Sequence, residues 1–221
     1  MIAQELINHM IPPLKMTDKA EKAITWMEEL RVNQLAVIQN GEYKGLISED
    51  IILENSAIVK YVGDFELKAK QCFVYHYQHF YDILKVGTDC GIQVIAVLDS
   101  DNKYIGVITI EDTVVAFAQS VAVQSPGGIL VLSMNYQDYS LAEISRLVES
   151  NNARVLSSCI KTDVAEPSKV KLTLKINKED LTHVMATLER FGYKVIAHFQ
   201  EAPIQTNERE RLDILMKYLE I

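Results

Sequence analysis

Two short segments of the sequence place a hydroxyl group and a carboxylate close together at the expected start of a helix. Thr109 precedes Asp112 by three residues, and Ser48 precedes Asp50 by two. A hydroxyl beside a helix N-terminus can donate to a phosphate oxygen, and a carboxylate can accept hydrogen bonds from adjacent hydroxyl groups of a ligand. The same residues can instead cap the helices. For Thr109 and Asp112 both interpretations stay open, whereas capping alone explains Ser48 and Asp50 adequately.

The other reactive side chains do not assemble into a catalytic or metal-binding set. His76 and His79 form an H-x-x-H pair, but too few carboxylates or thiols lie nearby in sequence to complete a metal site, so an aromatic packing surface is the preferred interpretation. Cys72, Cys90 and Cys159 are odd in number and far apart, which predicts reduced and mostly buried thiols. The sequence has no P-loop, no Gly-rich dinucleotide fingerprint and no paired catalytic acids. We therefore expect a protein that is not an enzyme and that has no metal and no resident cofactor.

Composition narrows the class of partner. The chain has 221 residues with 22 Lys and Arg against 30 Asp and Glu, a net charge of −8, and its basic residues are scattered. This charge makes nucleic acid and anionic membrane surfaces poor candidate partners. The longest apolar runs fall far below the ~20 residues of a membrane-spanning helix, and the N-terminus lacks a basic region followed by an apolar one. A cytoplasmic protein is expected.

The elements that position the candidate residues occur twice. Residues 35–50 return as residues 95–112: each copy has an apolar strand, a polar turn, a Gly-containing strand and an acidic helix start. The spacing is 60 residues from Ala36 to Ala96 and 61 from Gly45 to Gly106. Helical periodicity over residues 20–30 and 80–84 adds a helix before each pair of strands. Each copy is therefore expected to be helix, strand, strand, helix, and a repeat of this length indicates one unit used twice.

The C-terminal part has a different pattern, which begins after the break at residues 125–128. Strands are expected over residues 129–134, 154–161, 170–176 and 193–199, with helices over 141–150 and 181–188. The order βαββαβ predicts a four-stranded antiparallel sheet with two helices on one face. A short apolar stripe over residues 212–219 predicts a terminal helix.

The duplicated segments resemble a tandem pair of CBS domains. The ligand signature of that family is Gly, two apolar residues, Thr or Ser, any two residues and then Asp, and residues 106–112 fit it completely. The resemblance implies clefts that bind an adenosine-containing ligand such as AMP, ATP or S-adenosylmethionine, with Thr109 and Asp112 as ligand-binding residues. Ser48 and Asp50 are the weaker ligand-binding candidates, because Asp50 comes one position too early for the signature.

The βαββαβ part resembles an ACT-type domain, with Ser140 at the loop position where that family often has Gly. The expected fold class is α/β (α+β): a CBS-pair module of two repeats plus a ferredoxin-like ACT-type domain. The expected boundaries are 1–62 and 63–122 for the CBS repeats, 127–200 for the ACT-like domain and 201–221 for the C-terminal helix.

This domain order is similar to that of the regulatory proteins associated with acetoin utilisation in bacteria. It implies a cytosolic, homodimeric regulatory sensor in which the CBS pair is coupled to an ACT-like dimerisation or effector domain. The alternative is a structural interaction module that binds no nucleotide and docks on a partner enzyme.

Overall fold

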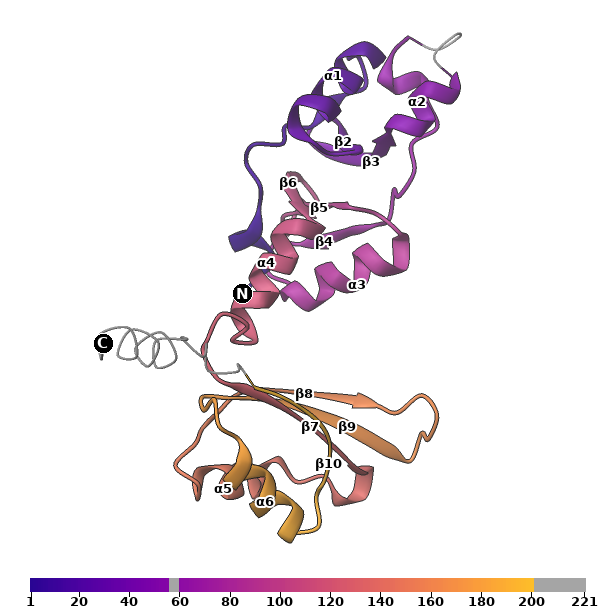
Figure 1. Cartoon of the computed structure of the whole chain (residues 1–221). Coiled ribbons are helices and arrows are strands. Elements are labelled where there is room, and N and C mark those ends of the chain that lie inside the picture. The colour runs from indigo at the N-terminus through magenta and orange to yellow at the C-terminus, as the bar shows by residue number, and fades with distance from the viewer. Residues whose placement is uncertain (56–59, 201–221) are drawn as a thin grey trace, which may run out of the picture. The chain divides into compact units, whose positions relative to one another are not determined.

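The computed structural model describes residues 1–55 and 60–200, and it divides the chain into two compact units, Met1–Phe117 and Ala118–Ile221 (Figure 1). The helix expected over residues 201–221 lies outside the described residues. Within the part of the chain that the structure describes, no helix is both long and apolar enough to cross a membrane.

The first unit is built from two similar repeats. In the first repeat the elements are β1 (Leu14–Lys15), α1 (Ala20–Leu30), β2 (Gln34–Gln39), β3 (Glu42–Ser48) and α2 (Glu49–Asn55). In the second repeat they are β4 (Phe73–Tyr75), α3 (Phe80–Cys90), β5 (Val94–Leu98), β6 (Tyr104–Thr109) and α4 (Ile110–Ser120). The predicted order helix, strand, strand, helix is confirmed in both. Each repeat also has a short first strand that pairs in parallel with the second, giving the sheets β1-β2-β3 and β4-β5-β6.

The tight turn of the first repeat has the geometry that its sequence predicts. Asn40 and Gly41 join β2 to β3, and both have positive φ, 54° and 80°. Two successive residues of positive φ match the right-handed twist of a hairpin, which is why Asn-Gly is favoured there. The turn pairs Ile38 with Tyr43, and a shift in register between Val37 and Ile38 then brings Ser48 opposite Gln34 at the far end of the hairpin.

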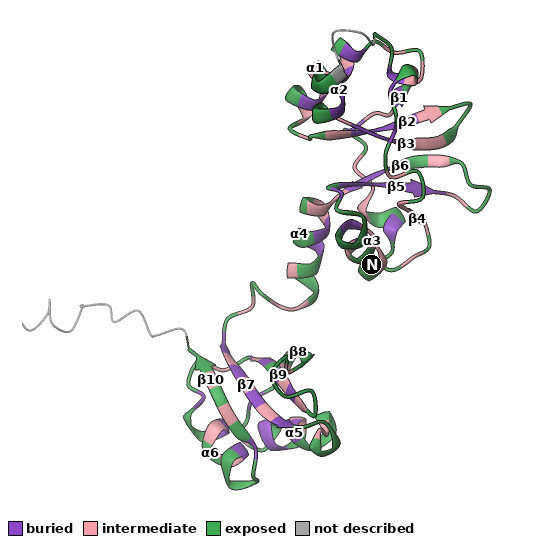
Figure 2. Ribbon diagram, turned by 90° about the vertical axis from the view of Figure 1, so that its right-hand side faces the viewer, coloured by how far each residue is buried: buried purple, intermediate pink, exposed green. Residues whose placement is uncertain are grey.

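The two repeats exchange the segments that lead into them. The segment before β1, with the short helix η1 (Ala3–Leu6), pairs with the second repeat through the bridge between Asn8 and Val107. The segment before β4, with η2 (Val62–Asp64), pairs with the first repeat through Lys68 and Leu46. The central strands of both repeats are buried (Figure 2), and they belong to a shared core that includes Val37, Ile47, Ile95 and Val107. The repeats are therefore one folding unit.

The second unit has the predicted βαββαβ order. Its elements are β7 (Gly128–Asn135), η3 (Tyr136–Asp138), α5 (Leu141–Glu149), β8 (Val155–Thr162), β9 (Lys169–Ile176), α6 (Thr182–Arg190) and β10 (Lys194–Phe199). The strands form an antiparallel sheet in the order β10-β7-β9-β8, and α5 and α6 cover one face of it (Figure 1). The strict alternation of β9 places Val170, Leu172, Leu174 and Ile176 in the core beneath those helices. The mixed α+β fold class is confirmed.

The prediction of reduced, mostly buried thiols is wrong for Cys72 and Cys90, whereas Cys159 is free as predicted but is not buried. Cys72 and Cys90 form a disulfide, with their Cα atoms 6.4 Å apart, and Cys159 is exposed on β8. The two bonded residues are 18 apart in sequence. They meet because the chain reverses direction between β4 and α3, which brings the end of α3 back beside the segment that leads into β4.

Candidate functional site

Thr109 and Asp112 lie next to each other where β6 passes into α4. The Thr109 hydroxyl donates to Asp112 Oδ2 at 2.7 Å, and the Asp112 backbone N–H donates to Thr109 Oγ1 at 3.0 Å. This is a helix cap, as the residue spacing allows. The amide of Asn8 also donates to Asp112 Oδ2, at 3.1 Å. The carboxylate that the sequence proposes for a ligand is therefore already hydrogen-bonded to two side chains of its own chain.

Asn8 reaches Asp112 because the N-terminal segment packs directly on β6. The Asn8 backbone N–H donates to the carbonyl of Val107 at 2.8 Å. The preceding residue, Ile7, lies against Gly106 so closely that a Cβ on Gly106 would collide with its side chain. The Gly of the signature thus makes room for the segment that carries Asn8.

Ser48 and Asp50 lie in a different environment, on the wall of a cavity of about 540 Å³ that we call the first-repeat cavity. Its lining comes from both repeats of the first unit: Asn33, Gln34, Leu46, Ser48, Glu49, Asp50, Ile51, Lys68, Ala69, Cys72, Cys90, Gly91 and Ile92. Ser48 and Asp50, the weaker candidates, therefore line a cavity, whereas Thr109 and Asp112, the stronger candidates, are hydrogen-bonded to each other in a helix cap.

The two sites differ because the first repeat has Ile51 at the position where the second repeat has Asp112. With the spacing of 61 residues, Ser48 corresponds to Thr109, but Asp112 corresponds to Ile51, which is 6 % exposed. Asp50 corresponds to Glu111 and, like it, is exposed. The carboxylate of the first repeat consequently lies about 100° further back around its helix.

Lys68 is a lining residue that the sequence interpretation missed. Its backbone N–H and carbonyl pair with the carbonyl and N–H of Leu46, at 3.0 Å and 2.8 Å, in the way that Asn8 pairs with Val107. Lys68 is thus the counterpart of Asn8, 60 residues later. It brings a cation to a cavity that also has Glu49 and Asp50 on its wall. The repeat spacing could have indicated this equivalence, but the exchange of segments could not be read from the sequence.

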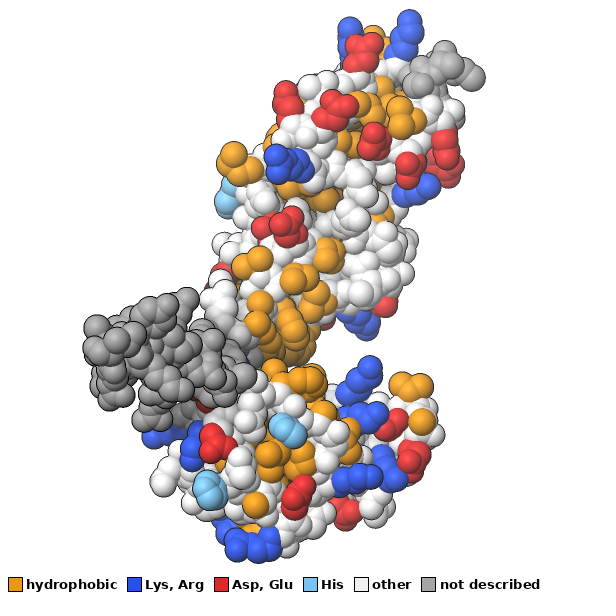
Figure 3. Space-filling view, in the orientation of Figure 1, with side chains coloured by type: hydrophobic (Ala, Val, Ile, Leu, Met, Phe, Trp, Pro, Cys, Tyr) orange, Lys and Arg blue, Asp and Glu red, His pale blue; other side chains and the backbone are white. Residues whose placement is uncertain are grey.

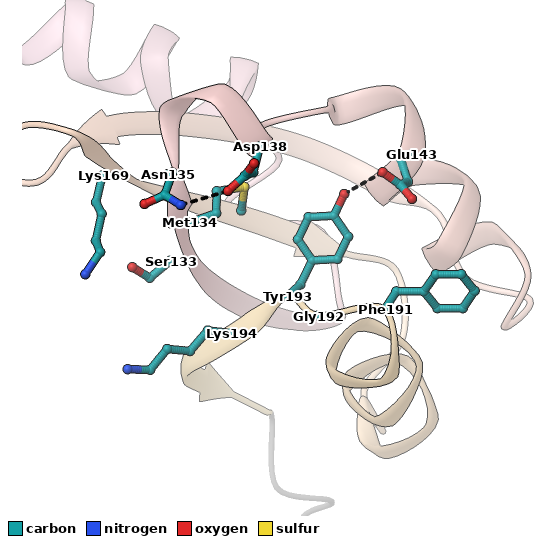
Figure 4. A pocket seen from close by; sticks show the side chains of 10 residues that line it. All are labelled: Ser133, Met134, Asn135, Asp138, Glu143, Lys169, Phe191, Gly192, Tyr193 and Lys194. Carbon is teal, nitrogen blue, oxygen red and sulfur yellow. Dashed lines mark hydrogen bonds between the residues drawn. The ribbon is translucent and has the colours of Figure 1, made fainter.

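The second unit has its own cavity, of about 560 Å³, beside the loop that follows β7. Lys169 and Lys194 lie on one side of it, and Asp138 and Glu143 lie on the other (Figure 4). The hydroxyl of Tyr193 donates to Glu143 Oε2 at 2.9 Å. Burial of the phenol, together with this bond to a carboxylate, raises the pKa of Tyr193 to about 12.

The loop over this cavity ends at Ser140, the residue that stands at the expected Gly position. Its hydroxyl accepts a hydrogen bond from the Glu143 backbone N–H at 3.3 Å, so Ser140 is the N-cap of α5. Asn135 and Asp138 of the same loop are hydrogen-bonded to each other at 2.8 Å, from amide to carboxylate. The loop thus presents polar groups that are held in place by local hydrogen bonds.

The H-x-x-H pair has structural partners. A ring nitrogen of His79 accepts from the Tyr81 backbone N–H at 3.4 Å as the N-cap of α3, and the His76 ring lies within hydrogen-bond distance of Gln4 and Ser100. Among the described residues, no cluster of three His, Cys, Asp or Glu side chains is arranged to hold a metal ion.

Comparison with models of known protein families gives no match for this sequence. Solved structures of CBS domain pairs are similar in fold. A CBS domain pair/ACT domain protein from Thermotoga maritima is 14% identical with a TM-score of 0.50, and the match covers 55% of this chain and 99% of that one. A CBS-pair protein from Arabidopsis thaliana is 19% identical with a TM-score of 0.47, covering 53% and 94%. A CBS protein crystallised in complex with AMP is 20% identical with a TM-score of 0.47, covering 53% and 96%. Over about 55% of its length, the chain has the fold of a CBS domain pair.

Proposed function

We propose that the chain is a regulatory module whose first unit binds an adenosine-containing ligand in the first-repeat cavity. The observation that carries the proposal is the cavity itself, which lies between two repeats of CBS-pair fold and has both polar and apolar walls. The Lys68 ammonium would attract a phosphate, and the Asp50 carboxylate would accept hydrogen bonds from ribose hydroxyls. Leu46, Ile51 and Ile92 offer apolar contacts to a purine ring.

Thr109 and Asp112 form the second candidate site, because they complete the family signature. A ribose there would have to replace the Asn8 amide as a hydrogen-bond donor to Asp112. Such an exchange gives little net free energy, since one hydrogen bond is lost for each one gained. The first-repeat cavity is therefore the preferred site for AMP, ATP or S-adenosylmethionine.

The proposed role is regulatory and not catalytic. A ligand can change the behaviour of the chain only through its difference in affinity for two arrangements of the repeats. The second unit would then report the change, either as a dimerisation domain or through an effector bound at its own cavity, where separate cationic and anionic sides suit a small zwitterion. A cytosolic location and an ACT-like role for this unit belong to the same proposal.

Calorimetric titration of the full chain with AMP, ADP, ATP and S-adenosylmethionine tests the binding. We expect at least one of these ligands to bind, and Asp50→Asn and Lys68→Gln each to weaken its binding by about tenfold, or about 1.4 kcal/mol. Asp112→Asn is the matched control and should leave the affinity unchanged. Loss of binding in Asp112→Asn alone would place the ligand at the second repeat, and no binding by the wild type would refute the proposal.

One observation favours a homodimer interface on the first unit. Hydrophobic side chains gather on the surface where α4 lies (Figure 3), and Val114 and Val115 of that helix are 52% and 54% exposed. Exposed apolar patches of this kind mark interaction sites. If α4 forms a homodimer interface, Val115→Glu will halve the mass measured by sedimentation equilibrium. An unchanged mass would exclude α4 from that interface.

A further inference from the structure

The first-repeat cavity has a disulfide in its wall. Cys72 belongs to the segment before β4, which also carries Lys68 and Ala69, and Cys90 is the last residue of α3. All of these residues line the cavity. The bond therefore joins two walls of the space that we assign to the ligand.

The part of this segment that lies next to Cys72 is hydrogen-bonded to the first repeat at Lys68 and Ala69. Lys68 pairs with Leu46, and the Tyr43 hydroxyl donates to the carbonyl of Ala69 at 3.0 Å. The Cys72 backbone N–H donates to the same Ala69 carbonyl at 3.0 Å. Ala69 itself has φ 54°, a left-handed conformation that disfavours a residue with a Cβ. The disulfide is thus a covalent restraint on a stretch of chain with an unfavourable backbone angle.

The pair is accessible to reductants. Cys90 is exposed and Cys72 is half-buried. With the two Cα atoms 6.4 Å apart, the separation lies within the range that a disulfide spans without backbone movement. Where a thiol pool keeps most cysteines reduced, a disulfide that forms is usually a transient or sensing one.

We propose that Cys72 and Cys90 form a redox switch that sets the affinity of the first-repeat cavity for its ligand; this inference rests on the proposed function. A low-molecular-weight thiolate attacks the exposed Cys90 sulfur, forms a mixed disulfide and releases the Cys72 thiolate, which takes up a proton. A second thiolate attacks the outer sulfur of the mixed disulfide and releases the Cys90 thiolate, which is protonated in turn. Two thiols become one small-molecule disulfide, and the protein gains two electrons and two protons. In the reduced form, the segment that carries Lys68 and Ala69 loses its covalent restraint to the end of α3.

The test uses the full chain with Cys159→Ser, so that the pair provides its only thiols. The protein is prepared oxidised with diamide and reduced with dithiothreitol, and thiol titration confirms each state. We expect AMP to bind the oxidised form about fivefold more tightly, a ratio well resolved by calorimetry. The variant with Cys72→Ser and Cys90→Ser in addition should show the weaker affinity in both buffers. Equal affinity of the oxidised and reduced forms would overturn the switch.

Hydrogen exchange gives a second readout that does not depend on the nucleotide. We expect reduction to speed exchange at the amides of Leu46 and Cys72, because both donate to the restrained segment. If no nucleotide binds in either state, the proposed function is refuted. Hydrogen exchange then tests by itself whether the disulfide restrains the wall of the cavity. Unchanged exchange after complete reduction would contradict it.

Discussion

Tyr43 and Tyr104 occupy equivalent positions in the two repeats but differ in their hydrogen bonding. The Tyr43 hydroxyl donates to the carbonyl of Ala69, whereas the buried Tyr104 hydroxyl has no partner among the described residues. Burial raises the pKa of both phenols far above its usual value, so both stay neutral. A buried hydroxyl without a partner destabilises the folded state. The two tyrosines therefore allow a direct comparison between a bonded and an unbonded hydroxyl at equivalent positions.

Substitution of each tyrosine by phenylalanine should therefore have unequal effects. We expect Tyr43→Phe to lower the free energy of unfolding by about 1 kcal/mol, since it removes a hydrogen bond and orphans a carbonyl. Tyr104→Phe should leave that free energy unchanged or raise it. Urea unfolding of both variants measures the difference, and an equal loss of stability would show that the Tyr104 hydroxyl has a partner after all.

Ionisation of Tyr193 should lower the free energy of unfolding of the second unit at alkaline pH. Its pKa is raised to about 12 in the folded chain, against 10.0 for an exposed phenol, so the folded state holds the proton more tightly than the unfolded state. The resulting stabilisation is complete below pH 10 and is lost as the pH rises toward 12. Denaturation at a series of pH values should show a steeper loss for the wild type than for Tyr193→Phe. Parallel pH profiles would contradict this account.

At the scale of elements, the close packing of the N-terminal segment on β6 is the feature most open to test. A Cβ at Gly106 would collide with the side chain of Ile7. We expect Gly106→Ala to cost about 1–3 kcal/mol of folding free energy, the usual cost of overpacking. Ile7→Ala removes the colliding atoms, so the double variant should lose less than the sum of the two single losses. Additive losses in thermal denaturation would exclude the contact as the cause.

The sequence predicted the elements well where periodicity extends over several turns or strand residues. Apolar spacing located α1, α5 and α6, and strict alternation located β9. β1 and β4, with two and three residues, are too short for a period to appear. Contacts between residues far apart in the chain could not be predicted either. The Asn8 amide, for example, lies 104 residues from the carboxylate of Asp112 that it contacts. For this reason the sequence could name Thr109, Asp112, Ser48 and Asp50 as candidates, but it could not show that Ser48 and Asp50 line a cavity or that Asn8 contacts Asp112.

At the scale of the whole molecule, the described residues form two separate cores. One includes Val37, Ile47 and Ile95, and the other includes Leu132, Leu172 and Val184; these two clusters, as far as the described residues define them, have no member in common. Cooperative unfolding follows packed cores, so each unit should unfold in its own transition.

Scanning calorimetry of the full chain should accordingly show two transitions. Leu172→Ala should lower the temperature of the second unit's transition only, because it removes about 2–5 kcal/mol from the unfolding free energy of that unit. Saturating AMP should raise only the transition of the first unit. A single transition that moves with both changes would mean that the units fold as one.

The most direct test of the proposed ligand site is a crystal structure of the full chain grown with AMP. The account predicts electron density for the nucleotide in the first-repeat cavity, with its ribose beside Asp50 and its phosphate beside Lys68. Density beside Thr109 and Asp112, with the Asn8 amide displaced and the first-repeat cavity holding only solvent, would contradict it.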